Sequence, residues 1–337
     1  MGAQHYQEAI AARASAALDR VSEAEWAVER TIVRSLRSAL GGTARLPMAR
    51  VRRAGPRERA AMGRFLYRGN ALVHRMDLSL PPPPGANVVT LHDVVAWTFP
   101  DEEAPAAAAA IELKRADAVV CVSAFTAHEA GRHLGVDRSV VIPNGVDERF
   151  FDAEPLGQEQ LARLGVTEPY VLYAGGSAAR KNLPGLARAW QSIERRLPGT
   201  QLVLAGPTSQ DREGLFANAE RVVHLGRVDD MTLTGLMAAA SVIVVPSLYE
   251  GFGLPALEAL AVGTPLLCAN TSSLPEVVGD AAFLCEPTVA SLAEGLEAMV
   301  RGEVDLAGMV TRGKERAVHF TWDRSAESHA RLWDSLR

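Results

Sequence analysis

Two glutamates, Glu250 and Glu258, stand eight positions apart beside a glycine-rich turn in the stretch Val242 to Pro265. The stretch opens with the short β-branched run Val242 to Val245, which predicts a strand buried on both faces of a parallel sheet. Parallel sheets bind ligands at the carboxyl ends of their strands. Carboxylates accept hydrogen bonds, so we expect both glutamates to contact sugar hydroxyls, with Glu258 accepting from a ribose diol. The alternative is a loop whose two glutamates are solvated.

The turn that follows this strand is suited to an anion. Gly251 and Gly253 allow the backbone to turn sharply and to approach a ligand closely. Pro255 suits the first turn of a helix that we expect to run through Ala261. The N–H groups at the start of that helix, and its dipole, favour a phosphate group. The whole stretch therefore predicts a site for an anion that bears hydroxyl groups.

A second cluster, Arg180, Lys181 and Asn182, follows another predicted strand and the loop Gly175 to Ala179. A helix should start just beyond it, near Leu183. Two cations at the carboxyl end of a strand indicate an anion as partner. A purely solvated pair is disfavoured, because cations at the start of a helix oppose its dipole.

The stretch from Val242 closely resembles the donor-site signature of the retaining glycosyltransferases of family 4, and Glu250 and Glu258 match that family's E-x7-E motif. Other family-like stretches occur in the family's order over about residues 88 to 325. They are LHDVVAWTFP from Leu91, DAVVCVSAFTAHE from Asp117, VIPNGVDERF from Val141, VLYAGGSAARKNL from Val171, HLGRVDD from His224 and SSLPEVVGDAA from Ser272.

The resemblance implies the α/β GT-B fold, with two Rossmann-like parallel-sheet domains facing a cleft. Strand-like and helix-like segments alternate along the chain as this fold requires. We expect an N-terminal acceptor domain at 1–160, a nucleotide-sugar domain at 161–322, and a helix at 323–337 that crosses back onto the N-terminal domain. A plain terminal helix is the alternative. The expected strands are 26–33, 72–76, 88–91, 118–122, 140–142, 170–174, 201–205, 221–225, 242–245 and 265–268.

The resemblance implies transfer of a hexose, of mannose or glucose type, from a nucleotide diphosphate sugar to an alcohol acceptor with retained anomeric configuration. By analogy, Lys181 and Arg180 stabilise the departing diphosphate, while Glu250 and His92 position the sugar. Arg227 is expected near the nucleotide. The full set of expected donor-binding residues is Arg180, Lys181, Arg227, Glu250, Gly251, Phe252, Gly253, Leu254, Pro255 and Glu258.

The acceptor side is expected in the N-terminal domain. His92 and Asp93 end a predicted strand and should face the interdomain cleft; Asp93 either positions His92 or touches the acceptor. Family members usually begin with a strand before a glycine-rich loop and a first helix, and Gly2 and Tyr6 could be the remnant of that loop and helix. Either a first strand lies upstream or this branch has dispensed with it.

One position departs from the family pattern. Some members have an arginine six residues before the lysine, where this chain has Gly175. Either Arg180 takes over part of its role or the phosphate pocket is less cationic. No metal-binding DxD motif is evident, so we expect activity without a metal or other cofactor, with GDP or UDP as the nucleotide.

Two alternatives to a transferase of this kind stay open, and nucleic acid is not expected as a partner. The first is a nucleotide-sugar-binding subunit of another enzyme that has itself lost catalysis. The second is another GT-B activity, such as nucleotide-sugar epimerisation. Nucleic-acid binding is a poor third, because the net charge is −5 and no stacking aromatics accompany the arginines.

Composition predicts a two-domain enzyme in a reducing cytoplasm, since 337 residues suffice for about two cores. No apolar run reaches the roughly 18 residues that a spanning helix needs. Cys121, Cys268 and Cys285 lie in apolar, strand-like contexts and are predicted to be buried thiols. Ser123 is a plausible helix N-cap and Asn144 a turn residue, so we expect both to have local structural roles.

Eight arginines and one glutamate, Glu58, fall between Arg45 and Arg68. They could form a surface that contacts anionic lipid at the inner membrane face or a lipid-linked diphosphate acceptor, with Phe65 and Leu66 at the interface. The alternative is a solvated arginine-rich helix and loop. The eight are Arg45, Arg50, Arg52, Arg53, Arg57, Arg59, Arg64 and Arg68.

Overall fold

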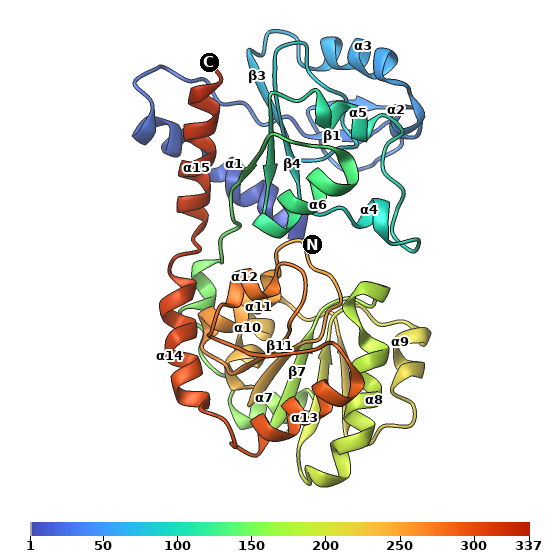
Figure 1. Cartoon of the computed structure of the whole chain (residues 1–337), viewed down its shortest axis with the longest axis vertical. Coiled ribbons are helices and arrows are strands. Elements are labelled where there is room, and N and C mark those ends of the chain that lie inside the picture. Colours follow the sequence, from blue (N-terminus) through green and yellow to red (C-terminus); the bar gives the residue numbers. More distant parts are fainter. Residues whose placement is uncertain (1) are drawn as a thin grey trace. The chain divides into compact units, whose positions relative to one another are not determined.

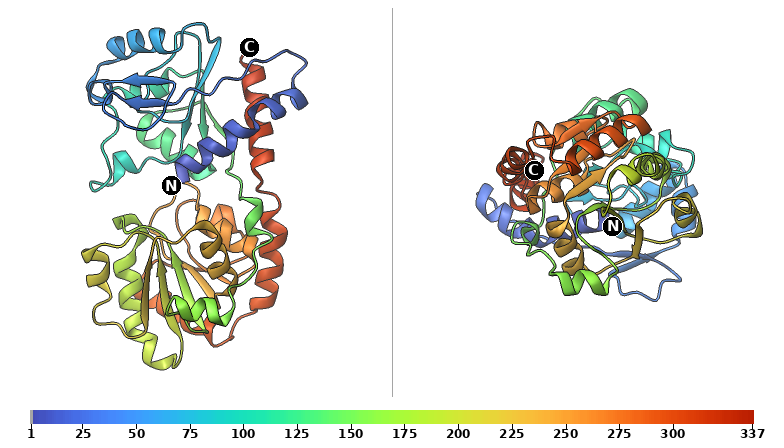
Figure 2. Two further views of the ribbon diagram at one scale, coloured as in Figure 1. Left: turned by 180° about the vertical axis from the view of Figure 1, so that it is seen from behind. Right: turned by 90° about the horizontal axis from the view of Figure 1, so that it is seen from below.

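The computed structural model describes residues 2–337, with side chains from residue 4 onward. The chain forms two compact units (Figures 1 and 2). The first unit consists of Met1–Gly145 together with Trp322–Arg337, and the second of Val146–Thr321. Among the described residues, no helix combines the length and the apolar composition needed to cross a bilayer.

The first unit is built on a four-stranded parallel sheet in the order β3 (Leu72–Arg75), β4 (Ala86–Leu91), β5 (Ala118–Cys121) and β6 (Ser139–Val141). A separate parallel pair consists of β1 (Val33–Ser35) and β2 (Ala44–Leu46). The helices of this unit are α1 (Gly2–Val21), α2 (Met48–Arg53), α3 (Pro56–Leu66), α4 (Val95–Thr98), α5 (Ala109–Lys114), α6 (Ala124–Leu134) and α15 (Trp322–Ser335).

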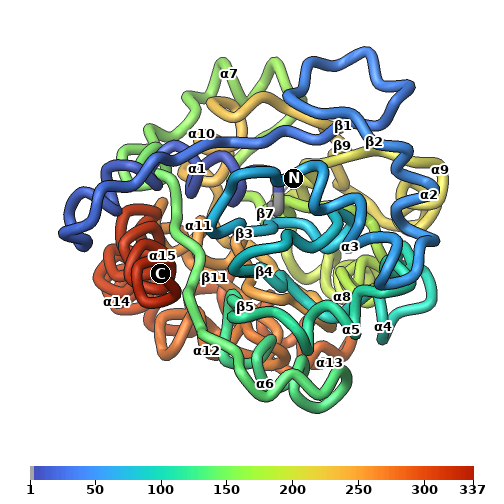
Figure 3. Tube along the Cα trace, turned by 90° about the horizontal axis from the view of Figure 1, so that it is seen from above, coloured from blue at the N-terminus to red at the C-terminus, as the bar shows by residue number. Residues whose placement is uncertain are grey.

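The C-terminal helix α15 packs along α1 at the other end of the chain (Figures 1 and 3). It buries Trp322, Ala326, Ala330 and Trp333, which recur at helical spacing and form one apolar stripe. These side chains share a core with Tyr6 and other residues of α1 and with the sheet. The expected helix across the N-terminal domain is therefore present.

A chain of hydrogen bonds runs through this core. Trp333 Nε1 can only donate, so His74 Nδ1 accepts its hydrogen bond (3.2 Å) and His74 Nε2 donates to Thr90 Oγ1 (2.8 Å). Thr90 also bonds Tyr6 Oη (2.8 Å), which in turn bonds His329 Nε2 (2.7 Å). These bonds join α1, β3, β4 and α15.

The hydrogen bonds of His329 determine which atoms donate and which accept along this network. His329 Nδ1 lies 2.7 Å from the carbonyl oxygen of Ser325, which only accepts, so His329 Nδ1 carries the proton and Nε2 accepts from Tyr6. Burial lowers the pKa of His329 to about 4 and that of His74 well below its usual value. Both imidazoles are therefore neutral at physiological pH, and each ring nitrogen has a partner.

The second unit contains a six-stranded parallel sheet in the order β12, β11, β10, β7, β8, β9. Its strands are β7 (Tyr170–Ala174), β8 (Gln201–Ala205), β9 (Val222–Gly226), β10 (Val242–Val245), β11 (Leu266–Ala269) and β12 (Phe283–Cys285). Its α-helices are α7 (Gln158–Arg163), α8 (Leu183–Ile193), α9 (Gln210–Leu215), α10 (Asp230–Ala239), α11 (Leu254–Val262), α12 (Leu274–Val278), α13 (Val289–Val300) and α14 (Leu306–Ala317). Short 3-10 helices are η1 (Glu148–Phe150), η2 (Ala179–Lys181) and η3 (Glu194–Arg196).

Both faces of this sheet are covered. Val242 and Val244 of β10 pack with Trp190 of α8 and Leu296 of α13 in one cluster. Because side chains alternate along a strand, Ile243 and the other intervening residues face the opposite side, where α11 contacts β10 and β11. Buried strands of this kind read as continuous apolar runs, and this explains why their sequence positions are predictable.

The strand predictions agree with the structure except at the N-terminus. The prediction of a strand at 26–33 is wrong, since only Val33 belongs to one, the short β1. Trp26 instead bonds Ser22 Oγ through its indole N–H (3.1 Å). The short strands β2 and β12 were not predicted. The three cysteines are buried free thiols and Ser123 caps α6, as expected.

The units divide at Gly145, upstream of the boundary expected at 160. Residues 146–160 bond to the second unit: Val146 N–H donates to the carbonyl of Phe320 (2.9 Å) and Leu156 N–H to that of Gly235 (3.2 Å). A polar segment with few predicted elements looks like a linker, but backbone hydrogen bonds and not composition decide which unit holds it.

Candidate functional site

The glycine-rich stretch forms the strand, turn and helix that its sequence predicts. After β10, the chain turns through Gly253, whose φ is +97°, and enters α11 with Pro255 in its first turn. A Cβ on Gly253 would lie 2.6 Å from Leu274 Cδ2, so both the conformation and the space require glycine. The first N–H groups of α11 have no acceptor within the helix and are suited to an anion.

Glu250 lies in this turn and is buried, with 6% of its surface exposed. Its Oε1 accepts hydrogen bonds from Lys181 Nζ (2.5 Å) and Ser247 Oγ (2.7 Å). Its Oε2 lies 3.4 Å from Arg180 Nη1. The structure thus joins the two clusters that the sequence singled out separately, about 70 residues apart, into one group of two cations and one carboxylate.

Two serines after β11 fix the backbone of Glu250. Its N–H donates to Ser272 Oγ (3.0 Å), and its carbonyl accepts from Ser273 Oγ (2.8 Å). Ser272 has a φ of +55°, which is uncommon for a residue other than glycine. In the sequence, Ser272 is distinguished only as the start of a family-like stretch. The signal for its role is the position of both serines at the carboxyl end of a strand adjacent to β10.

Asn182 fixes the turn that carries the two cations. It has a φ of +57° between η2 and α8, and its Nδ2 donates to the carbonyls of Pro246 and Pro287 (3.0 Å each). In addition, the carbonyl of Arg180 accepts from Leu248 N–H (2.7 Å). The cationic turn is therefore bonded directly to the loop that carries Glu250.

The cluster has a net charge of +1 and adjoins a small cavity of about 10 Å³, lined in part by Lys181, Ser247, Glu250 and Pro255. Within the described residues, Lys181 uses one of its three N–H groups, on Glu250. The others remain for an anion. The ammonium, Arg180 and the start of α11 together can offset much of the negative charge of a diphosphate.

Glu258, the second glutamate of the motif, differs from Glu250. It is half-buried on α11, and burial raises its pKa to about 7, while Arg149 and Lys181 act in the opposite direction. Both protonated and ionised forms are therefore present near neutral pH. In either form, this carboxyl group can hydrogen-bond a hydroxyl.

Arg227 follows β9 directly and is exposed. In the sheet, β9 is separated from β10 by β7 and β8, so the two strands are about 14 Å apart. Arg227 thus occupies the same strand-end edge as Glu250 but at its far side.

Gly175 cannot be replaced by a larger residue without a shift, because a Cβ there would lie 2.8 Å from Tyr173 Oη. The buried Arg212 lies close by but does not substitute for the family's arginine. Its Nη1 donates to the carbonyls of Gly175 (3.0 Å) and Pro207 (2.9 Å), and its Nη2 to that of Ala205 (3.3 Å). These bonds join the loop that follows β7 to the loop that follows β8.

His92 belongs to the first unit, directly after β4, and its ring contacts Tyr6 edge-on, with 4.8 Å between centroids. Burial lowers its pKa to about 4, so it is neutral. Its Nε2 is buried and has no hydrogen-bond partner among the described residues. Asp93 Oδ1 accepts from Val95 N–H (3.2 Å) at the start of α4. Gly2 begins α1, and its surroundings lie outside the described residues.

The arginine-rich stretch is not one surface. The expectation that Arg59 belongs to an exposed patch is wrong, because its side chain is 0% exposed and paired with Glu112 (2.6 Å). Arg53, Arg57 and Arg64 are exposed, and so is Phe65, at 85%. A sequence pattern of charges does not reveal that one arginine of the run has a buried carboxylate 53 residues away.

Comparisons with known proteins agree with this geometry. The model of the group 1 glycosyl transferases matches residues 159–316, and that of glycosyltransferase family 4 matches residues 80–150. The O-antigen chain mannosyltransferase B of Escherichia coli is 31% identical over 75% of this chain and 71% of its own length. The MMP alpha-(1->4)-mannosyltransferase of Mycolicibacterium hassiacum is 33% identical over 58% of this chain, which spans 47% of that protein.

Among solved structures, the sucrose-phosphate synthase of Thermosynechococcus elongatus superposes with a TM-score of 0.62 and 26% identity, over 75% of this chain and 68% of that one. An α,α-trehalose-phosphate synthase from Burkholderia xenovorans, 15% identical with a TM-score of 0.60 over 74% and 67% of the two chains, shares the fold. Matching sequence, architecture and donor-site motif together show that this chain belongs to glycosyltransferase family 4 and has the GT-B fold.

Proposed function

We propose that this protein transfers a hexose from a nucleotide diphosphate sugar to an alcohol acceptor in polysaccharide, glycolipid or glycoside biosynthesis, with retained anomeric configuration. The observation that carries the proposal is the cluster of the buried Glu250 with the half-buried Lys181 and Arg180, beside the start of α11. Two relatives that are mannosyltransferases and a structural neighbour that is a sucrose-phosphate synthase support a mannose-type or glucose-type donor.

In this proposal, Lys181 and Arg180 stabilise the charge that develops on the diphosphate as the sugar leaves. Glu250 holds both cations in place before the donor arrives, so little reorganisation is needed during the reaction. Among the described residues, its Oε2 has only the 3.4 Å contact with Arg180, so it retains lone pairs for a sugar hydroxyl. Glu258 would accept from the ribose, with GDP and UDP both open as the nucleotide.

Retention of the anomeric configuration is explained most simply if the acceptor hydroxyl attacks the sugar on the same face as the leaving diphosphate. Glu250 is neutralised by two cations, and this makes it a poor nucleophile for a covalent intermediate. The acceptor hydroxyl would then bond to the anomeric carbon as its bond to the diphosphate breaks, and a diphosphate oxygen would take the proton. Because the two cations and the start of α11 offset much of the charge of the diphosphate, we propose that the protein needs no metal ion.

The replacement Lys181→Ala tests the proposal. It should lower turnover of GDP-mannose or UDP-glucose by about 100-fold or more, since it removes a group that stabilises the transition state. Lys314→Ala is the control, because Lys314 is exposed on α14 of the same unit. Undiminished transfer by Lys181→Ala would refute the assignment. A parent protein that is stabilised thermally by GDP or UDP but transfers no sugar to any acceptor would favour the binding-subunit alternative.

We also propose that part of the arginine-rich stretch touches an anionic membrane surface, at the inner face of the cytoplasmic membrane. The exposed Phe65 beside the exposed Arg57 and Arg64 supports this reading. The triple replacement of Arg57, Arg64 and Phe65 by Gln, Gln and Ser should reduce sedimentation with phosphatidylglycerol vesicles. Equal sedimentation of parent and variant would contradict it, and no effect on donor binding is expected.

A further inference from the structure

Ser247 lies three residues before Glu250 in the turn that follows β10, and 1% of its surface is exposed. Its hydroxyl donates to Glu250 Oε1 (2.7 Å), the oxygen that also accepts from Lys181 Nζ (2.5 Å). The adjoining cavity of about 10 Å³ is large enough for a water molecule only, so a sugar does not reach this hydroxyl. Ser247 therefore affects a bound donor only through Glu250.

The two oxygens of the Glu250 carboxylate are not equivalent. Each carboxylate oxygen has two lone pairs, and those of Oε1 accept from an ammonium and from a hydroxyl. Among the described residues, Oε2 has only the 3.4 Å contact with Arg180 Nη1, and good N–H···O hydrogen bonds are about 2.7–3.2 Å long. Oε1 is thus filled, while Oε2 can accept from a further donor.

The backbone of Glu250 is fixed separately from its side chain. Its N–H donates to Ser272 Oγ (3.0 Å), and its carbonyl accepts from the fully buried Ser273 Oγ (2.8 Å). Donors prefer to lie near the plane of the oxygen that accepts from them. The two donors at Oε1, from Ser247 and Lys181, therefore set the plane of the carboxylate and the direction of Oε2.

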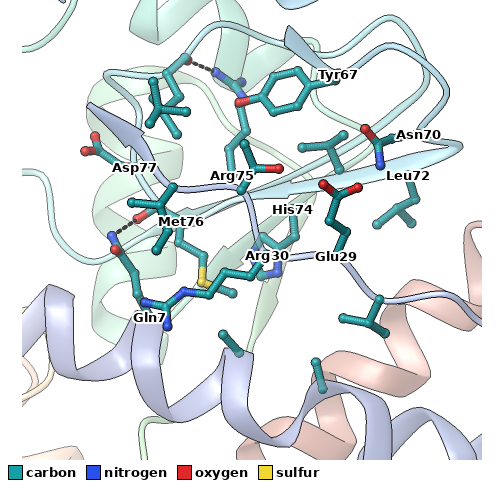
Figure 4. Close-up of a pocket in the computed structure, with 18 of the residues that line it drawn as sticks. Gln7, Glu29, Arg30, Tyr67, Asn70, Leu72, His74, Arg75, Met76 and Asp77 are labelled. Carbon is teal, nitrogen blue, oxygen red and sulfur yellow. Dashed lines mark hydrogen bonds between the residues drawn. The ribbon is translucent and has the colours of Figure 1, made fainter. Parts of the chain in front are cut away.

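A buried carboxylate of the first unit shows the opposite arrangement. Glu112 accepts from Arg59 at both oxygens (2.6 and 3.1 Å) and from Arg75 at Oε2 (2.8 Å). Arg75 lines a cavity of about 500 Å³ that follows the edge strand β3 (Figure 4), yet it is 1% exposed. Both oxygens of Glu112 are in use, as in a structural ion pair, whereas Glu250 keeps one oxygen available.

The two donors at Oε1 differ in what they do when a donor substrate binds. Under the proposed function, the ammonium of Lys181 is attracted to the diphosphate, and the attraction grows as negative charge develops there. Its bond to Glu250 then weakens. The hydroxyl of Ser247 is neutral and has no comparable attraction to the diphosphate. Ser247 is therefore the partner that keeps the carboxylate in place during the reaction.

We propose that Ser247 is a positioning residue for the donor sugar, because it holds Glu250 Oε1 so that Oε2 accepts from one hydroxyl of the hexose. The inference rests on the proposed function, in which Glu250 contacts the sugar. It adds that this contact uses a single oxygen and depends on a hydroxyl that does not touch the donor. Recognition of the sugar is then separable from recognition of the diphosphate by a substitution at position 247.

The variant Ser247→Ala tests this separation by calorimetric titration of the whole protein with GDP, GDP-mannose, UDP and UDP-glucose. We expect affinity for GDP or UDP to stay within about twofold of the parent, and affinity for the matching nucleotide sugar to fall about tenfold, because the hexose loses a charge-assisted hydrogen bond. Thr264→Val is the matched control. It removes a buried hydroxyl that donates to the carbonyl of Met237 (2.6 Å) at the amino end of β11, the opposite edge of the sheet, and should change neither affinity.

A role of Ser247 in folding alone gives a different result. Equal weakening of nucleoside diphosphate and nucleotide sugar in Ser247→Ala, unchanged affinity for the nucleotide sugar, or an equal loss in Thr264→Val would overturn the positioning role. If the parent still transfers the sugar, the proposed function survives these results. A parent protein that binds none of the four nucleotides would overturn the proposed function and this inference together.

Monodeoxy analogues of the nucleotide sugar that the parent binds identify the hydroxyl that Oε2 holds. In the parent, the analogue that lacks this hydroxyl should bind about tenfold more weakly than the full donor. In Ser247→Ala the same omission should cost about threefold or less, because the protein group and the hydroxyl act as a coupled pair. If every analogue costs the same in the parent and in the variant, Ser247 does not act on the sugar.

Discussion

Each unit contains a cluster of polar side chains, which is buried in the first unit and half-buried in the second, and the two clusters differ in kind. In the first unit, Tyr6, His74, Thr90 and His329 are neutral, and their ring nitrogens and hydroxyls are paired with one another, with Trp333 or with a carbonyl. In the second, Lys181 and Arg180 share one carboxylate, and among the described residues Lys181 uses one of its three N–H groups.

This difference indicates that the cluster of the first unit has a structural role and that the cluster of the second unit is suited to bind a ligand. A closed neutral network satisfies its members and fixes α15 against α1, so it has no capacity left for a ligand. A buried charged cluster with surplus donors is costly in the ligand-free protein, and a bound anion would remove that cost.

The largest expected effect is that of Glu250→Ala, which leaves two mostly buried cations without their carboxylate. The second unit should lose about 3–5 kcal/mol of stability, because uncompensated buried charge is strongly destabilising. Urea unfolding followed by tryptophan fluorescence can report this, since Trp190 is the one tryptophan of the sequence between 146 and 321. The double variant Lys181→Met/Glu250→Ala should recover part of the loss. A full loss in the double variant would mean that the pair is not coupled.

The next largest effect is a pH dependence that belongs to the neutral network. His329 has a folded pKa of about 4 against an ordinary 6.5, so the unfolded chain binds more protons between these values. Its contribution, about 3 kcal/mol, is fully present above pH 6.5 and is lost as the pH falls to about 4. His74 and His92 act in the same direction.

Unfolding free energies measured across this pH range check the prediction. His329→Gln should flatten the slope, since an amide can make the same bonds without titrating. An unaltered slope in that variant would show that His329 is not the group responsible.

The smallest expected effect is the loss of stability when a buried tyrosine loses its hydroxyl group. Tyr6→Phe should cost about 1–3 kcal/mol, because Thr90 and His329 both lose a buried partner. Tyr170→Phe should cost less, since Tyr170 Oη makes a single bond, to the carbonyl of Leu236 (2.6 Å). Thermal melts of the two variants give the comparison. If Tyr170→Phe is more destabilising than Tyr6→Phe, the hydrogen-bond network does not stabilise the first unit as we describe.

The strands of the second unit were predictable residue by residue because each is a continuous apolar run with turn residues at both ends. Val242–Val245 and Tyr170–Ala174 are examples. The structure of segment 26–33 was not predictable, because its mixed polar and apolar residues match a strand pattern only weakly. Whether such a segment forms a strand depends on pairing with a neighbouring strand. The boundary near Gly145 likewise depends on hydrogen bonds to residues far along the chain.

The sequence by itself determined the donor-site motif, the glycine at 253 and the cations at 180 and 181, because local turn chemistry and strand periodicity specify these features. Only the tertiary structure decided that Lys181 pairs with Glu250 and that Arg59 is buried and paired with Glu112. Each of these depends on which strand ends and loops meet in space. Pairing of charges between segments many residues apart leaves no periodic pattern in the chain.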